Sequence, residues 1–189
     1  DSFDQNIGAW RMDSIFRTNG MFGSGSPFNN GGSDSIKDWN VSSLVVMQGM
    51  FSFTTAFNQP LTNWDTSNVT NMREVFRMSV FDQPLNTWDT SKVTTMYGMF
   101  TGAIFNQDLD QWDTQNVQQT RNMFKDNRVF NGNISTWNMA KITTMDSMFY
   151  GAWDFNQDIS GWGNIPLCID IDFMFYDALV FNQPIGSWN

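Results

Sequence analysis

The sequence predicts an α/β fold: a solenoid of about eight coils of 24–26 residues, each a short parallel strand plus a short helix. Three observations predict it. Tryptophan recurs at near-constant intervals, a phenylalanine precedes most of these tryptophans by seven residues, and Ile or Leu precedes each by three. A period of about 20 to 50 residues is typical of solenoids, in which neighbouring repeats cover one another's apolar surfaces. The anchors are Trp10, Trp39, Trp64, Trp88, Trp112, Trp137, Trp162 and Trp188.

The strand is expected just before the tryptophan and the helix just after it. In the third coil "QPLTNW" (59–64) reads as a short strand or extended bridge, bounded by Pro60 and by the polar run after Trp64. "TSNVTNMREVF" (66–76) places apolar residues at spacings of 3, 3 and 1, which is one face of a helix of two to three turns. The asparagine or aspartate that follows Trp can cap its first turn. This order of elements predicts a right-handed, leucine-rich-repeat-like solenoid.

Composition favours one folded domain, 1–189, with a large aromatic core. Hydrophobic residues make up 41% of the chain, and it contains 18 Phe, 13 Met and 9 Trp. The formal net charge of −9 argues against a nucleic-acid partner, because binding phosphate needs clustered Lys and Arg. No apolar run approaches the roughly 20 residues of a membrane-spanning helix, so we expect no direct membrane insertion in this segment. Because both ends of the sequence fall within the repeat, we expect an excerpt of a longer array.

Two departures from the period are visible. "FNNGGSDSIKDW" (28–39) carries extra Gly and Ser residues, which predicts a loop pushed out of the second coil. The seventh coil has one extra residue, and counting back from Phe175 puts Cys168 where other coils have Val or Ile. We therefore expect Cys168 to be a buried small hydrophobe rather than a reactive thiol.

A polar residue follows the leading phenylalanine in every coil. We expect its side chain to cap backbone groups of the adjacent coil and to form a buried ladder along the solenoid. The positions are Asp4, Asn29, Asn58, Asp82, Asn106, Asn131, Asn156 and Asn182.

The stretches "FNQPLTNWDTSNVTNM" and "FNQDISGW" carry a family resemblance. They resemble the BspA-like surface-protein repeat, also called the PARCEL repeat, a Mycoplasma-type lipoprotein repeat of about 25 residues. The resemblance covers nearly the whole chain. It implies a leucine-rich-repeat-like solenoid displayed outside the cell or on its surface, with roles in adhesion and in binding host or matrix proteins. It implies no catalytic residues.

The residues offer little for catalysis or for a cofactor. The chain has no histidine, which removes the usual general base and the usual zinc ligand. Asp65, Asp89 and Asp113 recur in neighbouring coils, but Asn40 and Asn138 occupy the same offset, so their shared property is an oxygen that accepts hydrogen bonds. We expect capping, no enzyme and no cofactor. Since three stacked carboxylates repel one another, a bound Ca²⁺ stays an open alternative.

Two sets of residues are the predicted interaction surface. One is the pair of polar positions just before Trp, and the other is a group of aromatic residues outside the anchor register. Two functions follow as hypotheses: a module that binds a protein or glycan, or a structural protein whose repeats stack end to end into a filament or stalk. The candidate residues are Thr62, Asn63, Asn86, Thr87, Asp110, Gln111, Ser135, Thr136, Tyr150, Trp153 and Tyr176, with Ser160 and Gly161 in the next coil.

Overall fold

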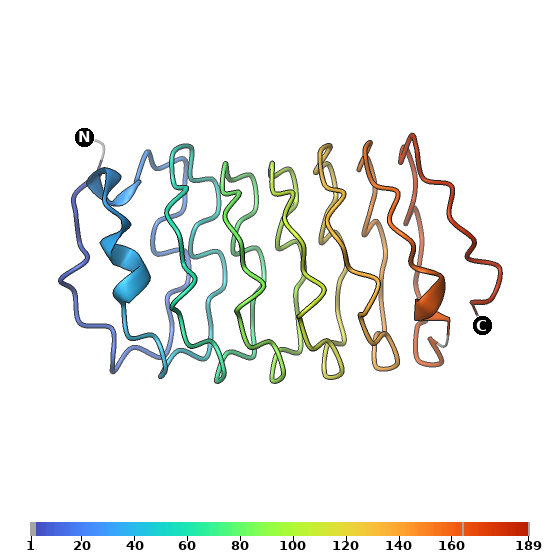
Figure 1. Cartoon of the computed structure of the whole chain (residues 1–189), viewed down its shortest axis with the longest axis horizontal. Helices are drawn as coiled ribbons and strands as arrows, with labels where there is room; N and C mark the ends of the chain where they lie inside the picture. The colour runs from blue at the N-terminus through green and yellow to red at the C-terminus, as the bar shows by residue number, and fades with distance from the viewer. Residues whose placement is uncertain (1–2, 164, 189) are drawn as a thin grey trace.

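The chain forms a rod of stacked coils. The computed structural model describes residues 3–163 and 165–188. Each coil lies beside the next along the long axis, and the two termini lie at opposite ends (Figure 1). One continuous apolar core runs through the rod from Ile7 to Met174.

The predicted α/β class is wrong. Within residues 3–163 and 165–188 the structure contains no α-helix and no extended strand, and its helices are three short 3₁₀ segments: η1 (Asn30–Gly32), η2 (Asp34–Asp38) and η3 (Ser160–Trp162). Segment 66–76, predicted as a helix, consists of turns around one isolated bridge residue, and segment 59–64 contains no strand. The coils are therefore neither strand-plus-helix units nor leucine-rich-repeat coils.

Left-handed backbone conformations prevent the predicted helix. Glu74 and Met78 both have φ of 53°, and the equivalent Gly98 and Gly102 have φ of 58° and 61°. An α-helix needs φ near −63° at every residue, so the positive value at Glu74 breaks the predicted helix 66–76, and that at Met78 prevents a helix from continuing beyond it. The apolar spacing of 3, 3 and 1 arises instead from successive tight turns that point the same residues inward.

The backbone hydrogen bonds of these turns alternate between two partners. The N–H groups of Glu74, Phe76 and Met78 donate to carbonyls of the next coil at 2.7–3.0 Å. Between them, the N–H of Arg77 donates to Glu74 O within its own coil at 3.2 Å. Alternate residues thus close a turn or join two coils, which satisfies buried backbone groups without a regular helix or sheet.

Only one residue per coil pairs in the parallel β manner. These bridges fall inside the segments that were predicted to be helical. They run along the whole rod as Arg17–Val46–Asn71–Thr95–Gln119–Thr144–Asp170.

Three columns of aromatic rings fill the core. Neighbouring tryptophans stack at centroid distances of 6.0–6.4 Å. The phenylalanines seven residues before Trp, together with Phe28 of the second coil, form a second column at 5.7–6.4 Å. The phenylalanines that lie after Trp, such as Phe76 at twelve residues from Trp64, form a third column at 5.5–5.8 Å. Rings of these last two columns touch at 3.8–4.1 Å in each coil. Each coil therefore buries the aromatic surface of the next.

The polar ladder next to these columns exists as predicted, but it is not buried. The backbone N–H of each member donates to the side-chain oxygen of the preceding member, at 2.7–3.2 Å, from Asp4 to Asn182. The side chains are half-buried or exposed. They fix the register of adjacent coils at the surface of the rod.

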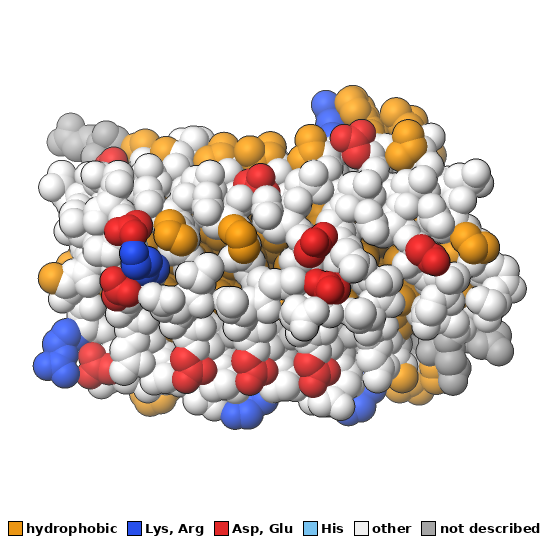
Figure 2. Space-filling view, viewed as in Figure 1, with side chains coloured by type: hydrophobic (Ala, Val, Ile, Leu, Met, Phe, Trp, Pro, Cys, Tyr) orange, Lys and Arg blue, Asp and Glu red, His pale blue; other side chains and the backbone are white. Residues whose placement is uncertain are grey.

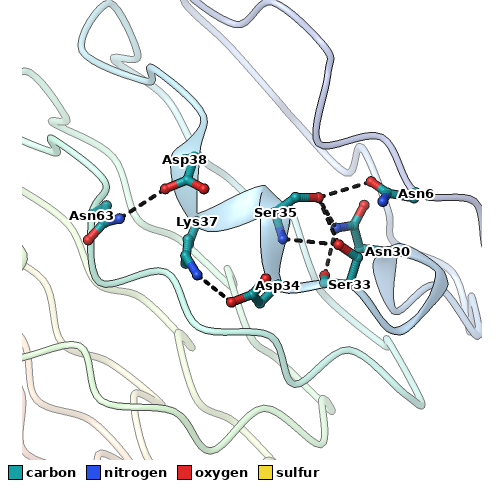
Figure 3. A network of polar contacts seen from close by, with 8 residues as sticks. All are labelled: Asn6, Asn30, Ser33, Asp34, Ser35, Lys37, Asp38 and Asn63. Carbon is teal, nitrogen blue, oxygen red and sulfur yellow. Dashed lines mark hydrogen bonds and ion pairs between the residues drawn. The ribbon is translucent and has the colours of Figure 1, made fainter.

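The insertion of the second coil is a hydrogen-bonded structure rather than an open loop. Its residues form η1 and η2, and Figure 3 shows the polar network around them. Asn30 is fully buried: its Oδ1 accepts from Ile7 N at 2.8 Å, and its Nδ2 donates to Ser33 O at 2.7 Å. The Ser35 hydroxyl donates to Asn6 Oδ1 at 2.9 Å, and Asn63 donates to Asp38 on the other side (Figure 3). The insertion is therefore tied to both neighbouring coils.

Cys168 occupies the predicted position but is only half-buried. Its N–H donates to Ile165 O at 3.0 Å, as Val69 N donates to Thr66 O at 2.8 Å in the third coil. The thiol is free and packs against the edge of the core. Burial was expected because Cys168 aligns with the buried Val or Ile of other coils, but this coil lies at the end of the rod and is covered on one side.

Candidate interaction surface

The polar pairs before Trp form a hydrogen-bonded ridge. Each pair sits at the corner of a tight turn, and stacking places the turns side by side; we call the set 62–63, 86–87, 110–111, 135–136 and 160–161 the turn ridge. Thr87 Oγ1 donates to Thr62 O at 3.0 Å, and Thr136 Oγ1 donates to Asp110 O at 2.6 Å. The structure thus brings the first predicted set together, with many of its polar groups already bonded to one another.

Asp110 is the electrostatic centre of the turn ridge. Asn86 Nδ2 donates to Asp110 Oδ1 at 2.8 Å, and Gln111 Nε2 donates to Oδ2 at 3.1 Å. The hydrogen bond from the Asn86 side chain, followed by that from Gln111, holds the pKa of Asp110 below its ordinary value. These neighbours on the ridge therefore stabilise the ionised form of the carboxylate.

The stacked aspartates cap turns, as expected, although the turns are not helical. Asp65 Oδ1 accepts from Ser67 N at 3.0 Å, and Asp89 and Asp113 accept in the same way at 2.9 and 3.0 Å. Hydrogen bonds from Ser67, from its side chain first and then its backbone, lower the pKa of Asp65. In the part of the chain that the structure describes, no three His, Cys, Asp or Glu side chains gather as metal ligands would.

The predicted aromatic group lies at the surface, within the last two coils. Tyr150 and Tyr176 stack at 4.9 Å, and Trp153 Nε1 donates to Asp177 Oδ2 at 3.3 Å. Tyr176 is 57% exposed, whereas Tyr150 and Trp153 are half-buried. The structure brings these residues together at the predicted place.

Basic side chains next to these aromatics were missed by the sequence reasoning. Every cation–aromatic contact of the described residues lies on one side of the coil: Arg73 over Tyr97 at 4.4 Å, Arg77 over Phe53 at 5.3 Å, Lys125 over Tyr150 at 4.6 Å and Arg128 over Trp153 at 4.0 Å. Arg121 belongs to the same side and pairs with Asp146 at 2.7 Å. We call this side the cation–aromatic face.

A periodic signal for this face was present in the sequence. It contains five of the ten basic residues and all three tyrosines. Arg73, Tyr97 and Arg121 each lie nine residues after Trp, while Arg77, Lys125 and Tyr150 each lie thirteen after it. The basic residues look scattered along the chain, and only alignment by coil position places them together.

Two adjoining hollows open on the cation–aromatic face. One, of about 460 Å³, is lined by Met78, Gly102, Ala103, Ile104, Asp126, Arg128 and Val129. The other, of about 240 Å³, is lined by Glu74, Arg77, Met78, Tyr97, Thr101, Asn122, Lys125 and Asp126. They share Met78 and Asp126, and we call them together the groove. In Figure 2, hydrophobic side chains gather along the upper edge of the molecule, whereas acidic ones are spread over the face in view.

No helix of the described residues has the length and apolar character needed to cross a membrane. Comparison with curated proteins gives no match, and neither does comparison with solved structures. The sequence model of the family described as "Mycoplasma protein of unknown function, DUF285" matches residues 1–104 and 101–189, which span the rod from end to end, and the chain therefore belongs to this family.

Proposed function

We propose that this chain is a non-catalytic module that binds a protein or a glycan outside the cell or at the cell surface. The observation that carries the proposal is the cation–aromatic face. Aromatic and arginine side chains are the residues that dominate binding energy at protein interfaces. Here they are concentrated on one side of a chain whose formal net charge is −9.

The repeated architecture supports binding rather than turnover. The polar groups that could act as acids or bases recur from coil to coil and cap turns or join coils, as Asp65 and Asp82 do. An enzyme site needs a singular arrangement of such groups. A rigid rod that presents variable side chains at fixed intervals suits recognition of an extended partner.

The finer family identity is part of the proposal. Membership of the Mycoplasma protein family agrees with the repeat type that the sequence resembles. We infer from that resemblance that the repeat is BspA-like and adhesive, and that the module is displayed on a surface lipoprotein.

A matched pair of charge variants tests the binding proposal. Arg77→Glu with Lys125→Glu reverses two charges on the cation–aromatic face, and Lys92→Glu with Lys141→Glu makes the same change in net charge elsewhere. The control lysines donate to Asn68 and Asn116 at 2.7 Å, away from the groove. Each variant is applied to arrays of extracellular proteins and of glycans. The face variant should lose about tenfold or more in affinity, and the control less than about twofold. Equal loss in both, or no bound component, contradicts the proposal.

End-to-end stacking is the second candidate, favoured by the apolar end coils. In the first coil Trp10 is 49% and Phe16 62% exposed, and in the last coil Ile169 is 89% and Phe173 62% exposed. Exposed apolar patches of this kind mark interaction sites. The first coil also carries a hollow of about 500 Å³ lined by Trp10, Ile15 and Met21 among others.

Sedimentation velocity over a range of concentrations tests stacking. Assembly through the ends predicts species that lengthen with concentration and that Ile169→Asp reduces to monomer. The control is Thr62→Asp, which introduces the same charge at an exposed position of the turn ridge in the third coil. A single monomeric species at every concentration rules out the filament.

A further inference from the structure

The groove has two chemically distinct halves that adjoin. Its larger half is walled by Met78, Ala103, Ile104 and Val129, and Ile104 and Met78 are each about half exposed to solvent (51% and 49%). Its smaller half is polar and contains the charged groups of Arg77 and Lys125. These residues come from three consecutive coils, those that follow Trp64, Trp88 and Trp112. The groove therefore extends along the axis of the rod.

We propose that the groove binds an extended peptide segment of a partner protein in which a large apolar side chain lies next to an acidic one. This inference rests on the proposed binding function and selects protein over glycan. The apolar side chain fills the larger hollow, and the carboxylate meets the cations of the smaller hollow and of its rim.

The apolar half fits an aliphatic or phenyl side chain. Its volume of about 460 Å³ exceeds that of any single side chain, so a peptide residue enters with part of its backbone. Exposed Met and Ile side chains gain from being covered, and a Met-lined surface adapts to partners of different shape. The charged residues among those that line this half are Asp126 and Arg128.

The charge of the groove favours an acidic residue. Arg77, Lys125 and Arg128 line it, against the carboxylates of Glu74 and Asp126. Arg77 Nη1 already pairs with Glu74 Oε1 at 2.9 Å, so the remaining lining charges are two cations, Lys125 and Arg128, and one carboxylate, Asp126. At physiological salt, charges farther than about 8 Å are largely screened, so a bound peptide senses this local balance more than the net charge of −9.

The same contacts argue against a sugar ring. Stacking on a sugar needs an aromatic face that is open to solvent. Arg73 covers a face of Tyr97, Lys125 one of Tyr150 and Arg128 one of Trp153. Tyr150 also stacks on Tyr176, and no aromatic side chain lines the larger hollow. The groove therefore offers an apolar wall and cations, which suit a peptide.

A displayed library of random peptides tests the inference. Peptides of roughly ten residues reach about 35 Å when extended and so span the groove. The library is selected against the whole chain, and the affinities of the selected peptides are measured by fluorescence polarisation. Two variants are compared: Ile104→Glu in the groove, where the residue is 51% exposed, and Leu179→Glu, an aliphatic position in the last coil and outside the groove that is 65% exposed.

Selected sequences should pair Leu, Ile, Met or Phe with Asp or Glu. Ile104→Glu should weaken their binding by about tenfold or more, and Leu179→Glu by less than about twofold. Selected peptides without this pairing, or with equal sensitivity to both variants, overturn the inference. Glycans bound on an array in an Ile104-dependent way overturn it while leaving the binding function standing. An absence of both peptide and glycan binding removes the binding function as well.

Discussion

From Trp39 to Trp188, each anchor indole joins two coils by two different interactions. Its ring stacks on the neighbouring indole, and its Nε1 donates to the carbonyl of the Ile or Leu in the preceding coil at 2.9–3.2 Å. The donor is buried, so it needs a partner inside the protein. The need for this bond explains why the anchor is Trp and not Phe in the seven coils that follow a preceding coil, from Trp39 to Trp188.

Trp88→Phe should lower the free energy of unfolding by about 1 to 3 kcal/mol. The change keeps an aromatic ring in the column but removes the bond from Nε1 to Leu61 O and leaves part of the indole volume empty. Urea denaturation monitored by circular dichroism measures the loss. Trp10→Phe, in the half-exposed first coil, is the control and should stay within about 0.5 kcal/mol. An equal loss in both variants would show that the interior bond contributes nothing.

Asn86→Ala should raise the pKa of Asp110 toward its ordinary value. The Asn86 side chain is the main cause of the lowered pKa, because its N–H stabilises the carboxylate. Because the pKa of Asp110 is lower in the folded than in the unfolded state, its ionised carboxylate increases the free energy of unfolding. This contribution is fully present above the unfolded pKa of about 3.9 and is lost as the pH falls through the folded pKa. Carboxyl titration by NMR measures it, with Asp65 as the internal control, since Ser67 lowers its pKa independently. An unchanged Asp110 pKa contradicts the assignment.

At the scale of the coil, the backbone is held by turns that alternate with bonds to the next coil. This pattern has a left-handed residue at two places in each coil, and glycine occupies them at 20, 49, 98, 102 and 151. Non-glycine residues such as Glu74 and Asn122 adopt the same conformation elsewhere. They are held there by the bonds to the neighbouring coil, which would be lost if the residue relaxed.

Gly98→Ala should lower stability by about 1 to 2 kcal/mol. At φ of 58° a Cβ is disfavoured, and it would lie 3.3 Å from Glu74 Cγ and from Thr101 Oγ1. Gly161→Ala is the control, because its Cβ would meet nothing closer than Ser135 O at 3.7 Å. Thermal and urea denaturation of both variants give the comparison. If Gly98→Ala were as stable as Gly161→Ala, the left-handed turn would not be what excludes a side chain there.

At the scale of the coil, the sequence predicts which residues face inward but not the backbone conformation that places them there. The period, the inward positions and the capping role of Asp65 were predictable, because they depend on spacing and on side-chain chemistry alone. The helix over 66–76 was not, since a spacing of 3, 3 and 1 fits a helix and a chain of tight turns equally well. Glu74 and Met78 give no local sign of a positive φ, which only the bonds to the next coil impose.

For the whole molecule, stability comes from the contact of each coil with its two neighbours. In a repeat array of this kind the free energy of unfolding is close to the sum of one contribution from each coil and one from each interface between coils. Middle coils such as the one around Phe76 are covered on both sides, whereas the last coil exposes Ile169 and Phe173. The rod should therefore open from its ends.

Hydrogen exchange should be slowest in the middle of the rod. Amides that donate between coils in 72–124 should exchange at least about tenfold more slowly than those of 15–23 and 168–181, because opening an end coil breaks one interface and opening a middle coil breaks two. Exchange followed by mass spectrometry at several times resolves these segments. Uniform protection along the chain would indicate one cooperative unit and contradict opening from the ends.

The sequence by itself determined the length of the repeat, the residues that face inward and the positions of the Asp and Asn ladder, and it singled out Tyr150, Trp153 and Tyr176 as one group. These depend on what each side chain requires of its surroundings, which is written in composition and spacing. Tertiary structure alone decided that the coils are built of turns, and that Arg73, Arg77, Lys125 and Arg128 share one face with a groove. The reason is that backbone bonds between coils and contacts between residues about 25 positions apart form only when the coils stack.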